Sequence, residues 1–199
     1  MQVITLSPTE LDKHAARLAE AVKTGSTCRF DAIVAVRRGG SLVCDAFCRH
    51  FPAGDYGVRF DVTLQRPSTQ RKGGGMSRIL KRLPVPILNA MRIMEAVMLG
   101  MLRQSEKNVP LPDVRIPEGL VTLLTGETGP AILLIDDAID SGDTLSAIAD
   151  AIKKTNPNTT IIIAVITETT VHPRIRANYT LYRNRTLIRF PWSNDYKGN

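Results

Sequence analysis

The chain is poor in the residue types on which disulfide-rich and metal-binding proteins depend. It has three cysteines, Cys28, Cys44 and Cys48, and three histidines in 199 residues. A small, odd number of cysteines argues against a disulfide framework and favours reduced thiols. Cys44 and Cys48 share one helical face, but His50 is the only histidine near them in sequence, so we interpret them as packing residues rather than metal ligands.

Long apolar runs are also missing. No stretch approaches the ~20 uninterrupted apolar residues of a membrane-spanning helix, and the N-terminus has no basic segment followed by an apolar one. We therefore expect a soluble, cytoplasmic protein without a membrane partner. A chain of 199 residues with 43% hydrophobic content is long enough to bury a full core, so residues 1–199 are expected to form a single domain.

Short apolar runs alternate with segments of helical periodicity. Residues 7–10 (Ser-Pro-Thr-Glu) are typical of a helix start, with an N-cap, a proline in the first turn and the glutamate of a capping box. Strands are expected at residues 3–6, 32–36, 58–64, 131–135 and 160–166, with helices between several of them. Such alternation predicts an α/β domain with a mostly parallel, twisted sheet flanked by helices. Segments 179–182 and 186–190 are expected to form a small C-terminal lobe.

The most informative segment runs from residue 132 to residue 144. Four apolar residues end at Asp136 and Asp137, and a turn with Asp140, Ser141 and Gly142 then leads into a helical pattern. The turn therefore lies at the carboxyl end of a strand and at a helix N-terminus, where backbone N–H groups and the helix dipole favour an anion. An ordinary helix cap is the simpler alternative, but it explains only one of these polar residues.

A second segment has the same organisation. An apolar run over residues 30–36 is followed by Arg37, Arg38, Gly39 and Gly40, and then by a helical pattern. Glycines let the backbone wrap around an anion, and arginine donates charge-assisted hydrogen bonds to it. Taken alone, this would be a basic turn with a glycine-rich helix start. Together with the first segment it indicates a second anion site.

Residues 136–144 resemble the phosphoribosyl-pyrophosphate motif of type I phosphoribosyltransferases, which has two acids, two apolar residues, an acid, Ser or Thr, Gly, any residue and Thr. Residues 37–40 resemble the family's pyrophosphate loop, in which the Arg37–Arg38 peptide bond would be cis. The resemblance implies that Asp136 and Asp137 bind ribose or magnesium, that Ser141, Gly142, Asp143 and Thr144 bind the 5′-phosphate, that Arg37, Arg38, Gly39 and Gly40 bind pyrophosphate, and that Asp140 is the catalytic base. Asp143 departs from the pattern by adding a negative charge beside the phosphate, and it is expected to point away.

The resemblance also implies an activity. A type I enzyme joins a nucleobase or related nitrogen acceptor to phosphoribosyl pyrophosphate and releases pyrophosphate. Its cofactor is Mg²⁺, which substrate oxygens and water would largely hold, so no metal site made by the protein alone is expected. The alternative is a non-catalytic module that senses phosphoribosyl pyrophosphate or a nucleotide.

The C-terminal Phe-Pro-Trp at residues 190–192 resembles the ending of the purine-salvage branch, which contains the xanthine/guanine and hypoxanthine enzymes. By that resemblance Leu187 and Ile188 would flank the base. Two departures stand out: Leu187 replaces an aromatic stacking residue, and Glu168 lies within Thr167-Glu168-Thr169, where a lysine would contact a 6-oxo group. Because a glutamate accepts hydrogen bonds, Glu168 is expected to disfavour a 6-oxopurine.

The middle of the chain is strongly basic. From Arg59 to Gln104 there are nine Lys and Arg residues against two acids, which equals the net charge of +7 of the whole chain. Residues 65–78 are expected to form a mobile loop, since a proline and three consecutive glycines break regular structure. In the family that the chain resembles, a flexible loop at this place closes over the active site. The resemblance therefore makes three of the basic residues candidates to meet pyrophosphate: Arg66, Arg71 and Lys72. A solvated basic surface and a nucleic-acid patch are alternatives, the second weakened by the lack of aromatic residues from 66 to 104.

A helical insertion is expected over residues 78–104. Its residues 87–102 are apolar almost all round and contain Met91, Met94, Met98 and Met101. A helix without a polar face must be buried in the core or against another subunit. We favour a homodimer interface, because this segment exceeds the minimal fold of the family.

Overall fold

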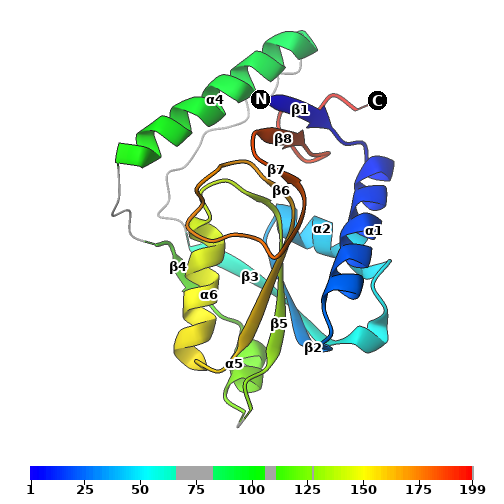
Figure 1. The fold of residues 1–199 in the computed structure, drawn as a ribbon, viewed down its shortest axis with the longest axis vertical. Helices are drawn as coiled ribbons and strands as arrows, with labels where there is room; N and C mark the ends of the chain where they lie inside the picture. The colour runs from blue at the N-terminus through cyan, green and yellow to red at the C-terminus, as the bar shows by residue number, and fades with distance from the viewer. Residues whose placement is uncertain (66–82, 106–110, 127, 199) are drawn as a thin grey trace.

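The computed structural model describes residues 1–65, 83–105, 111–126 and 128–198, and it consists of a six-stranded sheet with helices on both faces and a separate two-stranded sheet (Figure 1). The strands are β1 (Gln2–Thr5), β2 (Phe30–Val36), β3 (Tyr56–Gln65), β4 (Asp113–Arg115), β5 (Ala131–Ile139), β6 (Thr160–Glu168), β7 (Tyr179–Arg183) and β8 (Thr186–Arg189). The helices are α1 (Pro8–Gly25), α2 (Gly39–Cys48), the 3₁₀ helix η1 (Ala53–Asp55), α4 (Val85–Ser105), α5 (Glu118–Leu124) and α6 (Asp143–Thr155).

The larger sheet has the order β4-β3-β2-β5-β6-β7, and every neighbouring pair except β3–β4 is parallel. The mostly parallel α/β sheet expected from the sequence is thereby confirmed. After β2 the chain moves to one side of the sheet, and after β5 it moves to the other. In open α/β sheets the crevice at such a reversal, outside the carboxyl ends of the strands, is where ligands bind.

Alternate residues of the central strands face two different cores. Ile33 and Leu133 pack with α1 and α2, whereas Val34 and Leu134 pack with α5 and α6. This arrangement explains why β2 and β5 are apolar along nearly their whole length, since parallel strands covered on both faces have no solvated side. The two cores hold the sheet rigid below the crevice.

The predicted capping box at the start of α1 is present. The N–H of Glu10 donates to Ser7 Oγ at 3.3 Å, and the N–H of Ser7 donates to Glu10 Oε2 at 2.7 Å. All three cysteines are free thiols. Among the described residues no helix has both the length and the apolar character needed to cross a membrane.

The C-terminal lobe is built differently from the expectation. Segment 179–182 does not belong to it, because β7 extends the larger sheet alongside β6, with Ala164 opposite Tyr179. The lobe instead pairs β8 with the first strand of the chain, and Val3 lies opposite Leu187. The open edge of β6 explains the difference, since its unpaired backbone groups need a neighbouring strand.

Helix α4 lies beside β1 and β8, at the end of the sheet that carries the crevice (Figure 1). It is held there by Arg92, which donates to the carbonyl of Ile188 at 2.6 Å and to Asp195 Oδ1 at 2.9 Å. The described part of α4 is only partly buried in the chain's own core: Leu88 is buried, whereas Met94 and Met98 are 68% and 61% exposed. The expected mobile loop lies outside the described residues from residue 66 onward.

Candidate active site

Two chain segments meet at the carboxyl edge of the larger sheet. Strands β2 and β5 are neighbours, with Ala35 opposite Ile135, so the residues that follow them lie side by side. Strand β5 is longer than the sequence predicted and continues to Ile139, pairing with β6 as far as Glu168. Asp136 and Asp137 therefore belong to the strand rather than to the turn after it, which fixes their backbone.

A cavity of about 1190 Å³ opens at this edge. Most of the predicted site residues line it: Arg37, Arg38, Gly39, Asp136, Asp137, Asp140, Ser141, Gly142, Asp143, Thr144, Leu187 and Ile188. Gly40 lies directly behind the lining, where a Cβ would come within 2.9 Å of Asp136 Cα. Arg66, Arg71 and Lys72 lie outside the described residues.

The turn between β5 and α6 has the geometry of an anion cradle. Gly142 is the N-cap of α6, has φ +81°, and supplies no side chain to cap the helix. The hydroxyl of Ser141 accepts from the N–H of Asp143 at 3.2 Å. Asp143 is one of the residues that line the cavity, and its Oδ1 lies 3.4 Å from Nε of Arg174. The two side chains form an ion pair beside the start of α6.

The turn between β2 and α2 faces this cradle across the cavity. The Arg37–Arg38 peptide bond is cis, as the resemblance to the family's pyrophosphate loop implied. Both arginine side chains are exposed, and neither forms a salt bridge with any described residue. At Gly39 a Cβ would overlap Oδ2 of Asp137, so glycine lets the β2–α2 turn approach this side chain of β5 closely.

Asp136 and Asp137 form a pair of neighbouring carboxyl groups, of which the first is buried and the second half-buried. Burial raises the pKa of Asp136 well above its usual range, and repulsion from Asp137 raises it further. Burial also raises the pKa of Asp137, although Trp192 Nε1 donates to its Oδ2 at 3.1 Å and opposes that shift. Neither carboxylate forms a salt bridge with a described residue. Such a pair suits a divalent cation or the hydroxyl donors of a sugar.

The described residues contain no group of three or more acidic, histidine or cysteine side chains that would hold a metal by themselves. The carboxyl pair therefore fits a Mg²⁺ ion only as a partial ligand set. Mg²⁺ usually keeps several waters and is often bound by one or two carboxylates plus substrate phosphates, so this donor set is compatible with it.

Asp140 lies beyond the carboxyl pair, at the rim of the cavity. Its Oδ1 accepts a hydrogen bond of 2.6 Å from the hydroxyl of Thr169, which follows β6. The N–H of Thr169 in turn donates to the carbonyl of Ile139 at 2.9 Å. The side chain of Asp140 is exposed, so it is oriented by the protein and open to a ligand.

Part of the cavity lining is apolar. Leu187 and Ile188 are buried residues of β8 whose surfaces line it. Phe190 and Trp192 also line the cavity, and they stack with ring centroids 4.8 Å apart. Trp192 also contacts Asp137, so the C-terminal segment braces the carboxyl pair as well as the apolar wall.

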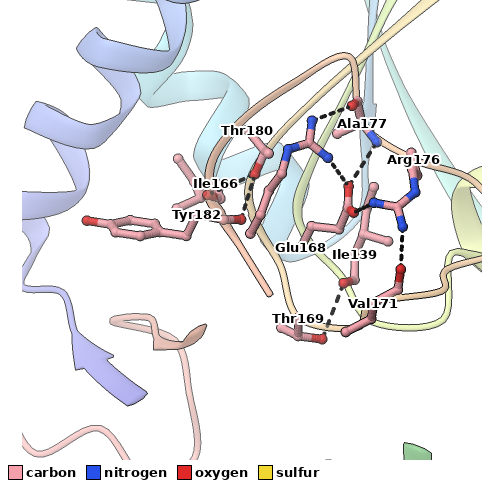
Figure 2. A network of polar contacts seen from close by, with 10 residues as sticks. Ile139, Ile166, Glu168, Thr169, Val171, Arg176, Ala177, Thr180 and Tyr182 are labelled. Carbon is pink, nitrogen blue, oxygen red and sulfur yellow. Dashed lines mark hydrogen bonds and ion pairs between the residues drawn. The ribbon is translucent and has the colours of Figure 1, made fainter. Parts of the chain in front are cut away.

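Glu168 does not line this cavity, and its expected role in base recognition is wrong. Its side chain is fully buried and is bound by Arg176 and Arg183 at 2.8 and 3.0 Å (Figure 2). Strand register explains the outcome. Thr167 and Thr169 flank Glu168 in sequence and do line the cavity, whereas Glu168 is directed into the segment between β6 and β7.

Several lining residues were missed by the sequence reasoning: Arg92, Glu95, Thr169, Arg174 and Arg185. Thr169 belongs to Thr167-Glu168-Thr169, the segment that was compared with the family in the sequence analysis. The sequence therefore pointed to this position, although not to this residue. The others lie in segments without a recognisable motif, and their approach to the site depends on how α4, the residues between β6 and β7, and the turn between β7 and β8 pack.

Comparisons with known proteins agree with this geometry. Solved structures similar to the chain include a purine phosphoribosyltransferase from Pyrococcus horikoshii Ot3, with TM-score 0.57, 18% identity, and coverage of 97% of this chain and 95% of that one. A xanthine-guanine-hypoxanthine phosphoribosyltransferase from Helicobacter pylori has TM-score 0.60, 17% identity, and coverage of 96% and 94%. A hypothetical protein from Neisseria gonorrhoeae with bound ppGpp has TM-score 0.58, 16% identity, and coverage of 96% and 89%.

These identities establish a shared fold alone. No curated protein sequence matches the chain. The model of the phosphoribosyl transferase domain matches residues 7–197, which is nearly the whole chain. The protein therefore belongs to the phosphoribosyl transferase domain family and has the type I phosphoribosyltransferase fold.

Proposed function

We propose that the protein is a Mg²⁺-dependent phosphoribosyltransferase that joins a nucleobase or related nitrogen acceptor to phosphoribosyl pyrophosphate and releases pyrophosphate. The observation that carries the proposal is the convergence of two anion-binding turns, a carboxyl pair and an apolar wall in one cavity of about 1190 Å³. Phosphoribosyl pyrophosphate has a phosphate at one end, a pyrophosphate at the other and a ribose between them, so each of its polar parts has a counterpart among these groups.

Each turn is assigned one end of the substrate. The N–H groups at the start of α6, with the hydroxyls of Ser141 and Thr144, bind the 5′-phosphate. Arg38 and the backbone at Gly39 bind pyrophosphate through charge-assisted hydrogen bonds. Asp136 and Asp137 accept from the ribose hydroxyls or from waters on Mg²⁺. When bound, the ion neutralises the negative charge that gathers on the departing pyrophosphate.

The reaction is a substitution at C1 of the ribose. The bond between C1 and the pyrophosphate oxygen breaks, and its electron pair leaves with pyrophosphate. A ring nitrogen of the acceptor forms the new bond to C1 and passes its proton to the carboxylate of Asp140. The hydrogen bond from Thr169 holds Asp140 toward the cavity, which keeps the base in place for that transfer.

The apolar part of the cavity lining is assigned to the acceptor. Leu187 and Ile188 would pack against a flat ring, and the purine-specific names of two similar structures support a purine or purine-like acceptor. The chain has Thr167, Glu168 and Thr169 where a lysine would donate to a 6-oxo group, and Glu168 is turned away. The acceptor specificity is therefore expected to differ from that of the 6-oxopurine enzymes.

Asp140→Asn tests the assignment. Purified protein is incubated with phosphoribosyl pyrophosphate, Mg²⁺ and a panel of bases while pyrophosphate release is followed. We expect the variant to bind phosphoribosyl pyrophosphate normally and to turn over at least about a hundredfold more slowly, the usual effect of losing a positioned base. Asp150→Asn, an exposed carboxylate of α6, is the matched control. Full turnover by the Asp140 variant would place the proton transfer elsewhere.

A non-catalytic sensor is the second candidate, and the ppGpp bound by the similar Neisseria gonorrhoeae protein favours it. The same cradle that accepts a 5′-phosphate would accept the phosphates of a guanine nucleotide. The two candidates separate in one comparison: an enzyme releases pyrophosphate with some base in the panel, whereas a sensor binds phosphoribosyl pyrophosphate or nucleotide without turnover.

The assembly and location belong to the proposal as well. The exposed apolar face of α4 carries Met91, Met94, Val97 and Met98, and we assign it to a homodimer interface, since patches of this kind are commonly interaction sites. The cytoplasm is the compartment that suits free cysteine thiols. Nucleic-acid binding is not favoured.

A further inference from the structure

The residues between β6 and β7 form one wall of the phosphate cradle. We call residues 170–177 the phosphate wall. The N–H of Arg174 donates to the carbonyl of Ser141 at 2.7 Å, so the wall is hydrogen bonded to the cradle. A Cβ on Gly142 would lie 2.8 Å from the backbone nitrogen of Ile175, which leaves no space between the two segments. Any displacement of the wall therefore moves the cradle.

Glu168 fixes the wall to the sheet. Its Oε1 accepts from Arg176 at 2.8 Å, and its Oε2 accepts from Arg183 at 3.0 Å and from the N–H of Ala177 at 3.3 Å (Figure 2). Arg176 also donates to the carbonyl of Val171, and Arg183 donates to that of Ala177 at 3.0 Å. One buried carboxylate thus ties both ends of the wall to the end of β6.

The wall carries Arg174 to the edge of the phosphate cradle. Arg174 lines the cavity, and its Nε lies 3.4 Å from Oδ1 of Asp143, the first residue of α6. A carboxylate at this position repels a phosphate. A guanidinium next to it cancels that charge and presents N–H donors in a planar arrangement that matches phosphate oxygens.

We propose that Arg174 is a binding residue for the 5′-phosphate, which compensates the charge of Asp143, and that Glu168 is the positioning residue that holds Arg174 there. The proposal rests on the assignment of the cradle to a 5′-phosphate made above. In this proposal Glu168 does not contact the acceptor. It contributes to substrate binding indirectly, because it holds the phosphate wall in place.

Two probes separate the ends of the substrate site. Ribose 5-phosphate reports on the cradle and inorganic pyrophosphate on the Arg38 turn, and both are titrated by calorimetry. Arg174→Gln should weaken ribose 5-phosphate binding about ten- to a hundredfold, the loss expected for a charge-assisted hydrogen bond. Pyrophosphate binding should not change. Arg49→Gln is the matched control, because Arg49 also pairs with a surface carboxylate, Asp12, and does not line the cavity.

A double variant tests the positioning role of Glu168. If Glu168 acts only through Arg174, Glu168→Gln weakens ribose 5-phosphate binding, but adding it to Arg174→Gln causes no further loss. A purely structural role would instead lower affinity by the same factor in both backgrounds and would weaken pyrophosphate binding too. If Glu168→Gln fails to fold, Arg183→Gln replaces it. The Arg183 side chain is 42% exposed, so a glutamine at this position can be hydrated and is expected to leave the protein folded.

The outcomes distinguish this proposal from the proposed function. If the wild-type protein binds neither ribose 5-phosphate nor phosphoribosyl pyrophosphate, both are overturned. If the wild type binds and folded Arg174→Gln binds equally well, only the role of Arg174 is overturned. The positioning role is overturned if Glu168→Gln, or Arg183→Gln in its place, weakens ribose 5-phosphate binding by the same factor in the wild-type and the Arg174→Gln backgrounds.

Discussion

Replacing Asp136 by asparagine should stabilise the protein without ligand at neutral pH. In the folded chain, burial and the neighbouring Asp137 hold the pKa of Asp136 well above its usual range. In the unfolded chain the pKa returns to about 3.9. Between these two values the folded state binds more protons than the unfolded state, so the free energy of unfolding falls as pH rises, with a limiting slope of about 1.4 kcal/mol per pH unit for one group.

Asparagine keeps the local geometry and removes the titration. The Oδ1 of Asp136 accepts from the N–H of Asp137 at 2.8 Å, and an amide oxygen can accept the same bond. Above the folded pKa the substitution therefore removes a buried charge with no described counter-ion. The free energy of unfolding of a folded domain is typically about 5–15 kcal/mol, so a change of about 1.4 kcal/mol over one pH unit is measurable.

Urea denaturation at a series of pH values from 4 to 8 measures the effect. The wild-type curve should decline more steeply with pH than that of Asp136→Asn, and the variant should be the more stable at pH 7. Asp150→Asn, an exposed carboxylate on α6, should follow the wild type. If the curves of wild type and Asp136→Asn run parallel, the carboxyl pair does not hold a proton and the electrostatic reasoning is wrong.

Three other outcomes are expected. Gly142→Val should abolish phosphoribosyl pyrophosphate binding in calorimetry and lower the free energy of unfolding by at least about 1–2 kcal/mol, because its positive φ and the adjacent backbone exclude a side chain; Gly54→Val, with no atom within 4 Å of its Cβ, is the control. Met94→Glu combined with Met98→Glu should leave the monomer folded but dissociate a dimer, and light scattering that finds wild-type monomers at micromolar concentration would remove the interface. Chelation of Mg²⁺ should weaken phosphoribosyl pyrophosphate binding, and binding with Mg²⁺ should release protons because it favours the ionised carboxyl pair.

Sequence alone was sufficient where the relevant residues are contiguous. Asp136, Asp137 and Gly142 lie within a few positions of one another, so the order of strand, turn and helix already places them at one edge of a parallel sheet. The same holds for Arg38 and Gly39 after β2. In both turns the backbone conformation depends on local residue types, and local residue types are what a sequence displays.

Tertiary structure decided the features that depend on distant partners. Glu168 is adjacent in sequence to residues that line the cavity, yet Arg176 and Arg183 turn it away, and no periodic pattern signals that pairing. Arg174 reaches Asp143 only because the segment carrying it packs on Gly142.

The edges of the fold show the same limit. Strand β1 pairs with β8 from the other end of the chain, while β7 joins the larger sheet, because unpaired strand edges are satisfied by whichever segment packs beside them. Helix α4 has an apolar pattern that demands burial, but the pattern does not specify against what. Contiguous patterns therefore determined the fold class and the two turns after β2 and β5, whereas long-range packing decided which other side chains line the cavity.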